Sequence, residues 1–188
     1  MLPRYKYLLT YRYAEIIHDL TVTFCRLYID RKSRTKDQME QAARSGKQNI
    51  VEGVEQSQTS KKGEIKLLGV AKASFTELLT DFEDFLRQNN YQIYPKSDQI
   101  VMEFRQKAYG LSHLRNLSHL GYLIEKPILP KDPKNAGNFL LTLCHLETYL
   151  LDKQIQSLVN SFITQGGFTE NLFKKRLEVK INKKILSP

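Results

Sequence analysis

The side chains best suited to chemistry are the four histidines and the acids near them. Glu15 and His18 stand three residues apart, the spacing with which helical bundles hold each half of a dinuclear metal site. Such a site needs a second copy of the motif. None follows, because the positions three residues before His113, His119 and His145 hold Gly110, Asn116 and Thr142. The sequence therefore predicts neither a metal site nor a cofactor.

Two other arrangements that could support catalysis are unsuitable. Cys144 is followed directly by a histidine, and adjacent residues on a helix do not face each other, so this pair cannot act as nucleophile and base. Gly166 and Gly167 follow a helical pattern instead of a strand and lack the Gly-Lys-Ser/Thr ending of a phosphate-binding P-loop. We therefore expect a non-enzymatic protein. An enzyme built on Glu15, His18 and carboxylates of the third helix would instead carry iron, manganese or zinc.

Two polar residues near the end of the second expected helix favour a structural interpretation. Asn49 and Glu52 lie beside Ile50 and Gly53, with no partner acid or base adjacent to them. We expect both to be partly buried, with the carboxylate or the amide bonding the free amides that open the third helix, where the helix dipole favours negative charge. Under this hypothesis Glu52→Ala lowers the melting temperature, and an unchanged melt refutes it.

Basic residues, which give the chain a net charge of +9, are concentrated in two clusters. The turn cluster fills the first expected interhelical turn and consists of Arg31, Lys32, Arg34 and Lys36. The tail cluster carries a charge of +5 over residues 174–184, where Glu178 is opposed by Lys174, Lys175, Arg176, Lys180, Lys183 and Lys184. Clustered cations attract polyanions through phosphate neutralisation. They also serve solubility and pairing between helices, and this alternative stays open.

A smaller mixture of basic and aromatic residues lies near the N-terminus. Tyr5, Tyr7 and Tyr11 flank Lys6 and Arg12, and tyrosine rings can stack on unpaired bases. Packing in a hydrophobic core would account for most of the tyrosines equally well.

Apolar residues recur at helical spacing along the chain, and no strand pattern appears. The strongest repeat is Leu68, Ala71, Phe75, Leu78, Phe82 and Phe85. Helices are predicted over 3–30, from Thr35 to 53–57, over 60–89, from Ser97 to a break near Gly110 or Asn116, over 135–165, and over 169–178. These elements predict an all-α fold, an antiparallel four-helix bundle with an extra helix inserted before the last bundle helix and a short C-terminal helix. The predicted domains are a helical bundle over 1–168 and a short basic helix and tail over 169–188.

Small residues and caps are expected to fix the ends and contacts of these helices. Met39, Ala43, Gly46, Ile50 and Gly53 share one face of the second helix, where small side chains permit close approach to a neighbouring helix. Thr35 and Gln38 match a capping box at the start of that helix. Gly166 and Gly167 suit a left-handed cap at the end of the fifth.

Composition restricts the class of protein further. A chain of 188 residues with 41% hydrophobic content can bury a core. It contains no apolar run of the roughly 18 residues that a membrane span needs, and its first helix lacks the apolar centre of a signal peptide. We therefore expect a cytoplasmic protein. Cys25 and Cys144 fall on apolar helix faces, as free thiols that act as small hydrophobes do.

Residues Gln38 to Gly53 resemble the pattern Gln-x-x-x-Ala-x-x-Ser-x-x-x-Asn-Ile-x-Glu-Gly of the four-helix bundle protein family, which includes proteins encoded in intervening sequences of bacterial large-subunit ribosomal RNA genes. Residues 60–64, 68–74 and 77–78 are similar to the third helix of that family. Residues 137–138, 150–155 and 166–168 resemble its subgroup with a suffix segment. Gly46-Lys47 departs from the commoner apolar residue and proline, which implies a straighter second helix.

The same family includes the accessory protein of diversity-generating retroelements, a basic pentameric barrel that works with a reverse transcriptase and nucleic acid. The resemblance implies a homo-oligomer, with a pentamer as its precedent, and association with RNA or DNA.

Two hypotheses follow. The first is an oligomeric helical adaptor that binds nucleic acid or a nucleoprotein partner through its basic clusters. The second is a protein-protein scaffold without a role in nucleic-acid binding, with subunit contacts from the helix around 100–120 and from Val51 and Val54.

Overall fold

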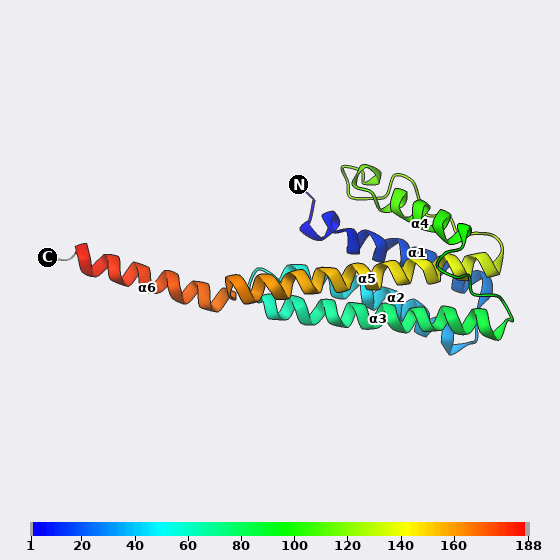
Figure 1. Ribbon diagram of the computed structural model, residues 1–188, viewed down its shortest axis with the longest axis horizontal. Coiled ribbons are helices and arrows are strands. Elements are labelled where there is room, and N and C mark those ends of the chain that lie inside the picture. The colour runs from blue at the N-terminus through cyan, green and yellow to red at the C-terminus, as the bar shows by residue number, and fades with distance from the viewer. Residues whose placement is uncertain (1, 187–188) are drawn as a thin grey trace.

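The computed structural model describes residues 2–186, with side chains as far as residue 181. Over this range the chain is all-α, and the one strand-like pairing is an isolated bridge between Leu117 and Leu123 (Figure 1). The elements in chain order are η1 (Arg4–Tyr7), α1 (Leu9–Tyr28), α2 (Arg34–Gln56), α3 (Lys61–Gln88), α4 (Gln99–Ser112), η2 (Leu114–Asn116), α5 (Pro133–Gln165) and α6 (Phe168–Leu186). None of these helices is both long and apolar enough to cross a membrane.

The four long helices α1, α2, α3 and α5 pack around one core. In this arrangement α1 and α3 each contact both α2 and α5, while α4 lies against α1 and α5. We call η1 through α5 the helical body. The predicted stripe of α3 is buried along its whole length, and Phe24 of α1 packs edge-on against Phe82 and Phe85, with ring centroids 5.1 and 4.8 Å apart.

The first predicted helix is divided in two. Leu8 adopts an extended conformation (φ −76°, ψ 133°), which separates η1 from α1. At the other end Ile29 is again extended and ends α1 at Tyr28. Leu27, in the last turn of α1, is 57% exposed.

Small residues bring α2 and α3 close together, as their spacing predicted. Met39, Ala43, Gly46, Ile50 and Gly53 are all buried. A Cβ atom at position 46 would lie only 2.6 Å from Cε2 of Phe75, so a glycine is needed there. At position 53 a Cβ atom would meet its nearest neighbours at an ordinary 3.5 Å. A second close approach lies where α2 ends and α3 begins, because a Cβ atom at Gly63 would collide with the Gln56 side chain.

The caps of α2 and α3 differ from two predictions. The helix α2 begins one residue earlier than expected, at Arg34, and its cap is Ser33, whose hydroxyl accepts from the Thr35 amide at 3.2 Å. At the start of α3 the hydroxyl of Ser60 accepts from the Gly63 amide at 3.0 Å. Glu52 is exposed and accepts no hydrogen bond from these amides among the described residues, so the expected cap from Glu52 is wrong.

The two polar residues of α2 have other environments than expected. Glu52 is exposed, so the expectation that it is partly buried is wrong. Asn49 is half-buried and donates to the Ser45 carbonyl of its own helix at 2.8 Å. Of the proposed second stripe, Val54 is buried and Val51 packs against the core, so neither is free for a subunit contact.

The connection from α4 to α5 is held by one buried amide. Asn116 donates to the Leu111 carbonyl at 2.8 Å and to the Glu125 carbonyl at 3.1 Å, and it accepts from the Glu125 amide at 2.7 Å. These bonds fold the segment back on itself after the predicted break. They leave several of its large apolar side chains exposed, namely Leu114, Leu120, Tyr122, Ile124 and Ile128.

The last helix is longer than predicted and stands away from the helical body (Figure 1). Gly166 ends α5 with φ 72° and ψ 175°, a positive φ as expected, but in an extended region essentially restricted to glycine instead of the left-handed helical region. The chain then enters α6 at Phe168 and stays helical to Leu186, beyond the predicted end near Glu178.

Candidate nucleic-acid interface

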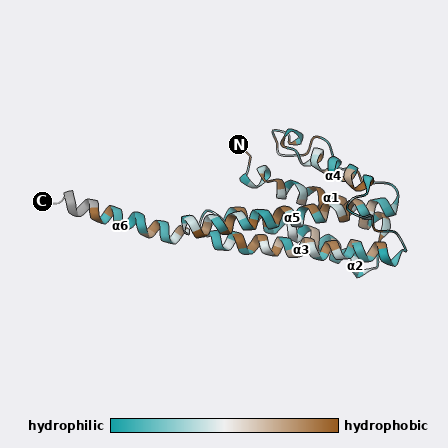
Figure 2. Cartoon of the chain, in the orientation of Figure 1, coloured by the Kyte–Doolittle hydropathy of each residue, from teal (hydrophilic) through white to brown (hydrophobic). Residues whose placement is uncertain are grey.

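The tail cluster lies on a helix that is open to solvent on all sides. The structure describes four of its side chains, Lys174, Lys175, Arg176 and Lys180, and all are exposed. None of these four forms a salt bridge with another described side chain. The side chains of Lys183 and Lys184 lie outside the described residues. Figure 2 shows hydrophilic residues interspersed with hydrophobic ones along the projecting helix.

The acids of α6 do little to offset this charge. Glu170 folds back on the start of the helix, where its Oε2 accepts from the Gly167 amide at 2.9 Å. A Cβ atom at Gly166 would collide with the same carboxylate at 2.5 Å. At position 167, a Cβ atom would lie 2.9 Å from the Phe162 ring. The two glycines thus leave room for the Glu170 carboxylate and the Phe162 ring. Glu178 is the acid that lies within the tail cluster.

The turn cluster has a different environment. Arg31, Lys32 and Arg34 are exposed. Lys36 is paired with Glu40 at 3.1 Å and lies 3.9 Å from Asp37, and hydrogen bonding to Glu40 raises the pKa of the lysine. The fourth cation of this cluster is therefore already neutralised within α2.

Acids from a second helix lie at the same turn, although one of them, Asp84, is already paired with Arg87 at 2.7 Å. A hollow at the turn is lined by Asp30 together with Asp81 and Asp84 of α3. Burial, followed by the charges of Glu77 and Asp84, raises the pKa of Asp81 to about 6. The turn is thus a region of mixed charge, whereas the exposed part of α6 is predominantly cationic.

The structure does not bring the two clusters together. The turn lies beside the start of α5, where the Tyr28 hydroxyl donates to the Lys131 carbonyl at 2.7 Å. The tail cluster follows the other end of α5, a helix of 33 residues and so about 50 Å long (Figure 1). In one copy of the chain they cannot form a single patch.

The aromatic and basic mixture near the N-terminus is used in packing. Lys6 is paired with Glu15 at 2.8 Å, and the Tyr11 hydroxyl donates to the same oxygen at 3.1 Å. Arg12 is buried, donates to the Ser112 and Lys6 carbonyls, and has its pKa lowered by burial. Of the three tyrosines, Tyr7 is exposed.

The residues considered for catalysis or metal binding have separate partners. Glu15 faces Lys6, whereas Nδ1 of His18 is 3.1 Å from the ammonium of Lys47. Burial, then the charge of Lys47, lowers the pKa of His18. Among the described residues, no three acid, histidine or cysteine side chains gather as a metal site would require. Both cysteines are buried, and burial raises the pKa of Cys25 to about 12.

One buried carboxyl was not anticipated. Glu147 of α5 is completely buried, and neither of its carboxyl oxygens has a hydrogen-bond partner among the described residues. Burial raises the pKa of this carboxyl well above its ordinary value. The signal was present in the sequence, because Glu147 lies between Cys144 and Leu151 on the inward stripe of α5 at three- and four-residue steps.

Comparison of this chain with known protein families, with curated proteins and with solved structures finds no match in any of the three.

Proposed function

We propose that this chain is a non-enzymatic, oligomeric helical adaptor of the cytoplasm that binds nucleic acid or a nucleoprotein partner. The four long helices are taken to form the antiparallel four-helix bundle of the family that the sequence resembles. The helix α6 is the binding element in this proposal, and the helical body positions it.

One observation carries the proposal: α6 presents four exposed cations within seven residues, and none of them forms a salt bridge with another described side chain. Each phosphate that such cations neutralise releases counterions, so affinity depends on salt with a slope of about 0.7 to 0.9 per phosphate in a plot of log affinity against log salt. The turn cluster is the weaker contributor in this proposal, because Lys36 is paired with Glu40 and acids of α3 line a hollow at the turn.

Oligomerisation would give α6 the packing that it lacks within one chain. Phe173, Leu177 and Ile181 recur at four-residue steps and are 61%, 42% and 56% exposed. Most helical stability in proteins comes from tertiary packing of an amphipathic face. An apolar ridge of this kind can pack against the same ridge of another copy, in a pentamer or another closed assembly.

The test is binding of fluorescent single-stranded RNA and duplex DNA, followed by anisotropy between 50 and 200 mM salt. We expect binding at low salt that weakens steeply as salt rises. Absence of binding at low salt, or affinity that ignores salt, would overturn the proposal. The mass and absorbance ratio of the native particle report subunit number and bound nucleic acid together.

The second candidate function is a protein-protein scaffold without a nucleic-acid role. It is favoured by the exposed apolar side chains of residues 114–128 and of α6. An oligomer that is free of nucleic acid on purification and does not bind it afterwards would support this alternative.

A further inference from the structure

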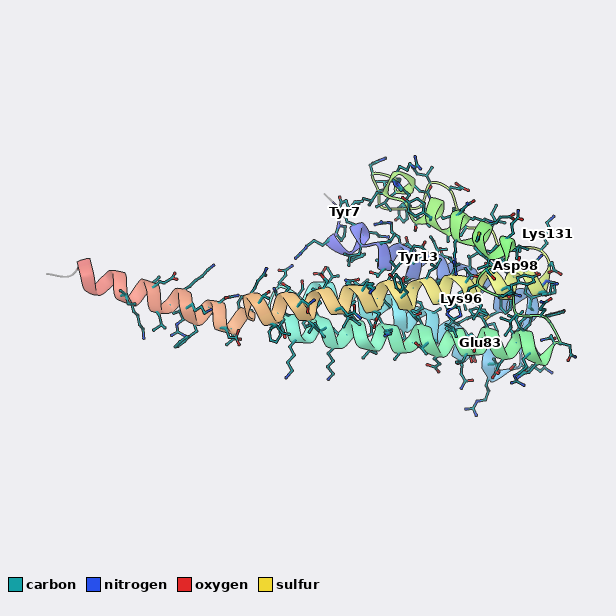
Figure 3. The ribbon with its side chains drawn as sticks, in the orientation of Figure 1. Tyr7, Tyr13, Glu83, Lys96, Asp98 and Lys131 are labelled. Atoms are coloured by element: carbon teal, nitrogen blue, oxygen red, sulfur yellow. The ribbon has the colours of Figure 1, made fainter. Side chains whose placement is uncertain are left out.

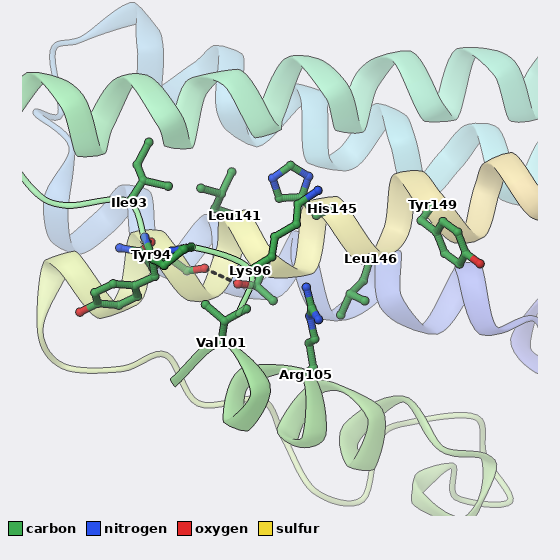
Figure 4. Close-up of a pocket in the computed structure, with 12 residues that line it drawn as sticks. Ile93, Tyr94, Lys96, Val101, Arg105, Leu141, His145, Leu146 and Tyr149 are labelled. Carbon is green, nitrogen blue, oxygen red and sulfur yellow. Dashed lines mark hydrogen bonds between the residues drawn. The ribbon is translucent and has the colours of Figure 1, made fainter. Parts of the chain in front are cut away.

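A hollow on the helical body is distinct from both basic clusters. It lies between the loop that follows α3, the helix α4 and the helix α5, and encloses about 390 Å³ (Figure 4). Val101, Leu141 and Leu146 form an apolar surface within it, and Tyr149 stands at one side. This volume is at the lower end of the range for small-molecule sites, which are mostly apolar with a few placed polar groups.

The wall of the hollow is fixed by a buried amide. Asn138 of α5 is only 2% exposed. Its side chain accepts from the Tyr94 amide at 2.8 Å and donates to the Gln92 carbonyl at 3.0 Å. The Tyr94 hydroxyl, in turn, donates to Asn135 at 2.6 Å. These bonds attach the loop to α5, so the hollow is formed before any ligand arrives.

Three nitrogen-bearing side chains from three elements surround the apolar surface. Lys96 comes from the loop, Arg105 from α4 and His145 from α5, and Figure 4 shows Lys96 reaching toward His145 and Arg105 extending from α4 toward α5. Neither Lys96 nor Arg105 forms a salt bridge with another described side chain. The positive potential of the site is therefore not cancelled by a close ion pair.

The titration of His145 reflects this surplus of positive charge. Burial lowers the pKa of His145, and the charges of Lys96 and Arg105 lower it further. The charge of Glu83 of α3, labelled with Lys96 in Figure 3, acts in the opposite direction. A negative group seated between Lys96 and Arg105 would remove the repulsion that these two cations exert on a protonated imidazole.

We propose that this hollow binds a small amphipathic anion, with its acidic head between Lys96 and Arg105 and a short alkyl or aromatic group against Leu141 and Leu146. Charge complementarity selects the anion, and the apolar surface selects its tail. The acidic head is a carboxylate or a phosphate, since both match the guanidinium of Arg105. The site is independent of nucleic-acid binding by α6.

The experiment uses the full chain with octanoate, octyl phosphate and the uncharged octanol as probes. Binding is followed by NMR titration of the four histidine imidazoles. We expect octanoate or octyl phosphate to bind at least about tenfold more tightly than octanol, as a charge-assisted hydrogen bond implies. Whichever anion binds more tightly identifies the head group. Binding should raise the pKa of His145 and leave His113 and His119, on the connection after α4, unchanged.

Two matched variants separate the site from general attraction by a basic protein. Arg105→Gln and Lys96→Gln change exposed side chains and should each weaken anion binding about five- to tenfold. Lys131→Gln removes the same charge outside the hollow, where the structure uses only the backbone carbonyl of that residue, and should leave binding unchanged. Equal binding of octanol and the anions, an unmoved His145, or an equal loss in Lys131→Gln would overturn the proposal.

Discussion

The turn cluster and the tail cluster look alike as sequence and differ as structure. Both are dense runs of lysine and arginine. At the turn, Glu40 pairs with Lys36 while Asp81 and Asp84 arrive from a helix far along the chain. On α6 no such acids arrive, because the helix leaves the body. The potential that a polyanion meets is thus set by the fold around the cations and not by their number.

Neutralising the tail cluster is expected to have the largest effect. The variant Lys174→Gln, Lys175→Gln, Arg176→Gln and Lys180→Gln should weaken RNA or DNA binding about a hundredfold or more at 50 mM salt. It should also reduce the slope of log affinity against log salt by about 3, because four phosphate contacts are lost. Circular dichroism should show that the helical body still melts cooperatively. Retained affinity would remove α6 from the interface.

Removing acids at the turn should narrow the difference between the two clusters in their contribution to nucleic-acid binding. The double variant Asp81→Asn and Asp84→Asn removes two acids from the hollow at the turn and releases Arg87 from its 2.7 Å bridge to Asp84. We expect affinity for nucleic acid to rise about three- to tenfold at low salt, with the gain lost by 200 mM as screening increases. An unchanged affinity would mean that the turn does not reach the bound polyanion.

Neutralising the turn itself should matter little. The variant Arg31→Gln, Lys32→Gln and Arg34→Gln removes three charges, as a matched control for the tail variant. We expect a loss of about two- to threefold in the anisotropy assay, because neighbouring acids already offset these cations. A loss as large as that of the tail variant would reverse the ranking of the two clusters.

The smallest expected effect concerns stability and pH at the turn. Burial raises the pKa of Asp81 to about 6 in the folded protein, above its ordinary value near 4. The folded state therefore binds the proton more tightly, and this group lowers stability as pH rises from about 4 to about 6. Asp81→Asn should raise the melting temperature by about 2–4 °C at pH 7.5, the shift for roughly 1 kcal/mol after allowance for partial exposure.

Differential scanning calorimetry at two pH values tests this last expectation. The gain should shrink as pH falls and vanish at about pH 3, below the ordinary pKa near 4, where the carboxyl is protonated in both states. A gain of the same size at both values would show that the change acts through packing instead of charge.

The sequence predicted the fold class and most of the buried faces, because helical periodicity is a local signal. The α3 stripe is confirmed, and α4 begins at Gln99 with Asp98 as its cap, two residues after the predicted start at Ser97. Local signals failed where two candidates competed, as with Ser33 against Thr35, and where the backbone bends without a glycine or proline, as at Leu8. The extent of α6 was underestimated. The predicted end near Glu178 has no helix-breaking residue to mark it, and the helix continues to Leu186.

The candidate sites were less accessible to sequence reasoning. The basic residues could be found by counting, but the acids that surround the turn come from a helix more than forty residues away. The three side chains around the hollow come from the loop after α3, from α4 and from α5, with no shared spacing. Only the packing of these elements places them together.

The junction at Gly166 has a geometric consequence. Its backbone angles exclude almost every other residue, and the two glycines there are the whole link between α5 and α6. A side chain at position 166 would force other backbone torsions there and change the direction in which α6 projects. Every lysine of α6 would be retained. Gly166 thus sets the direction of the basic helix α6 independently of the charge that the helix carries.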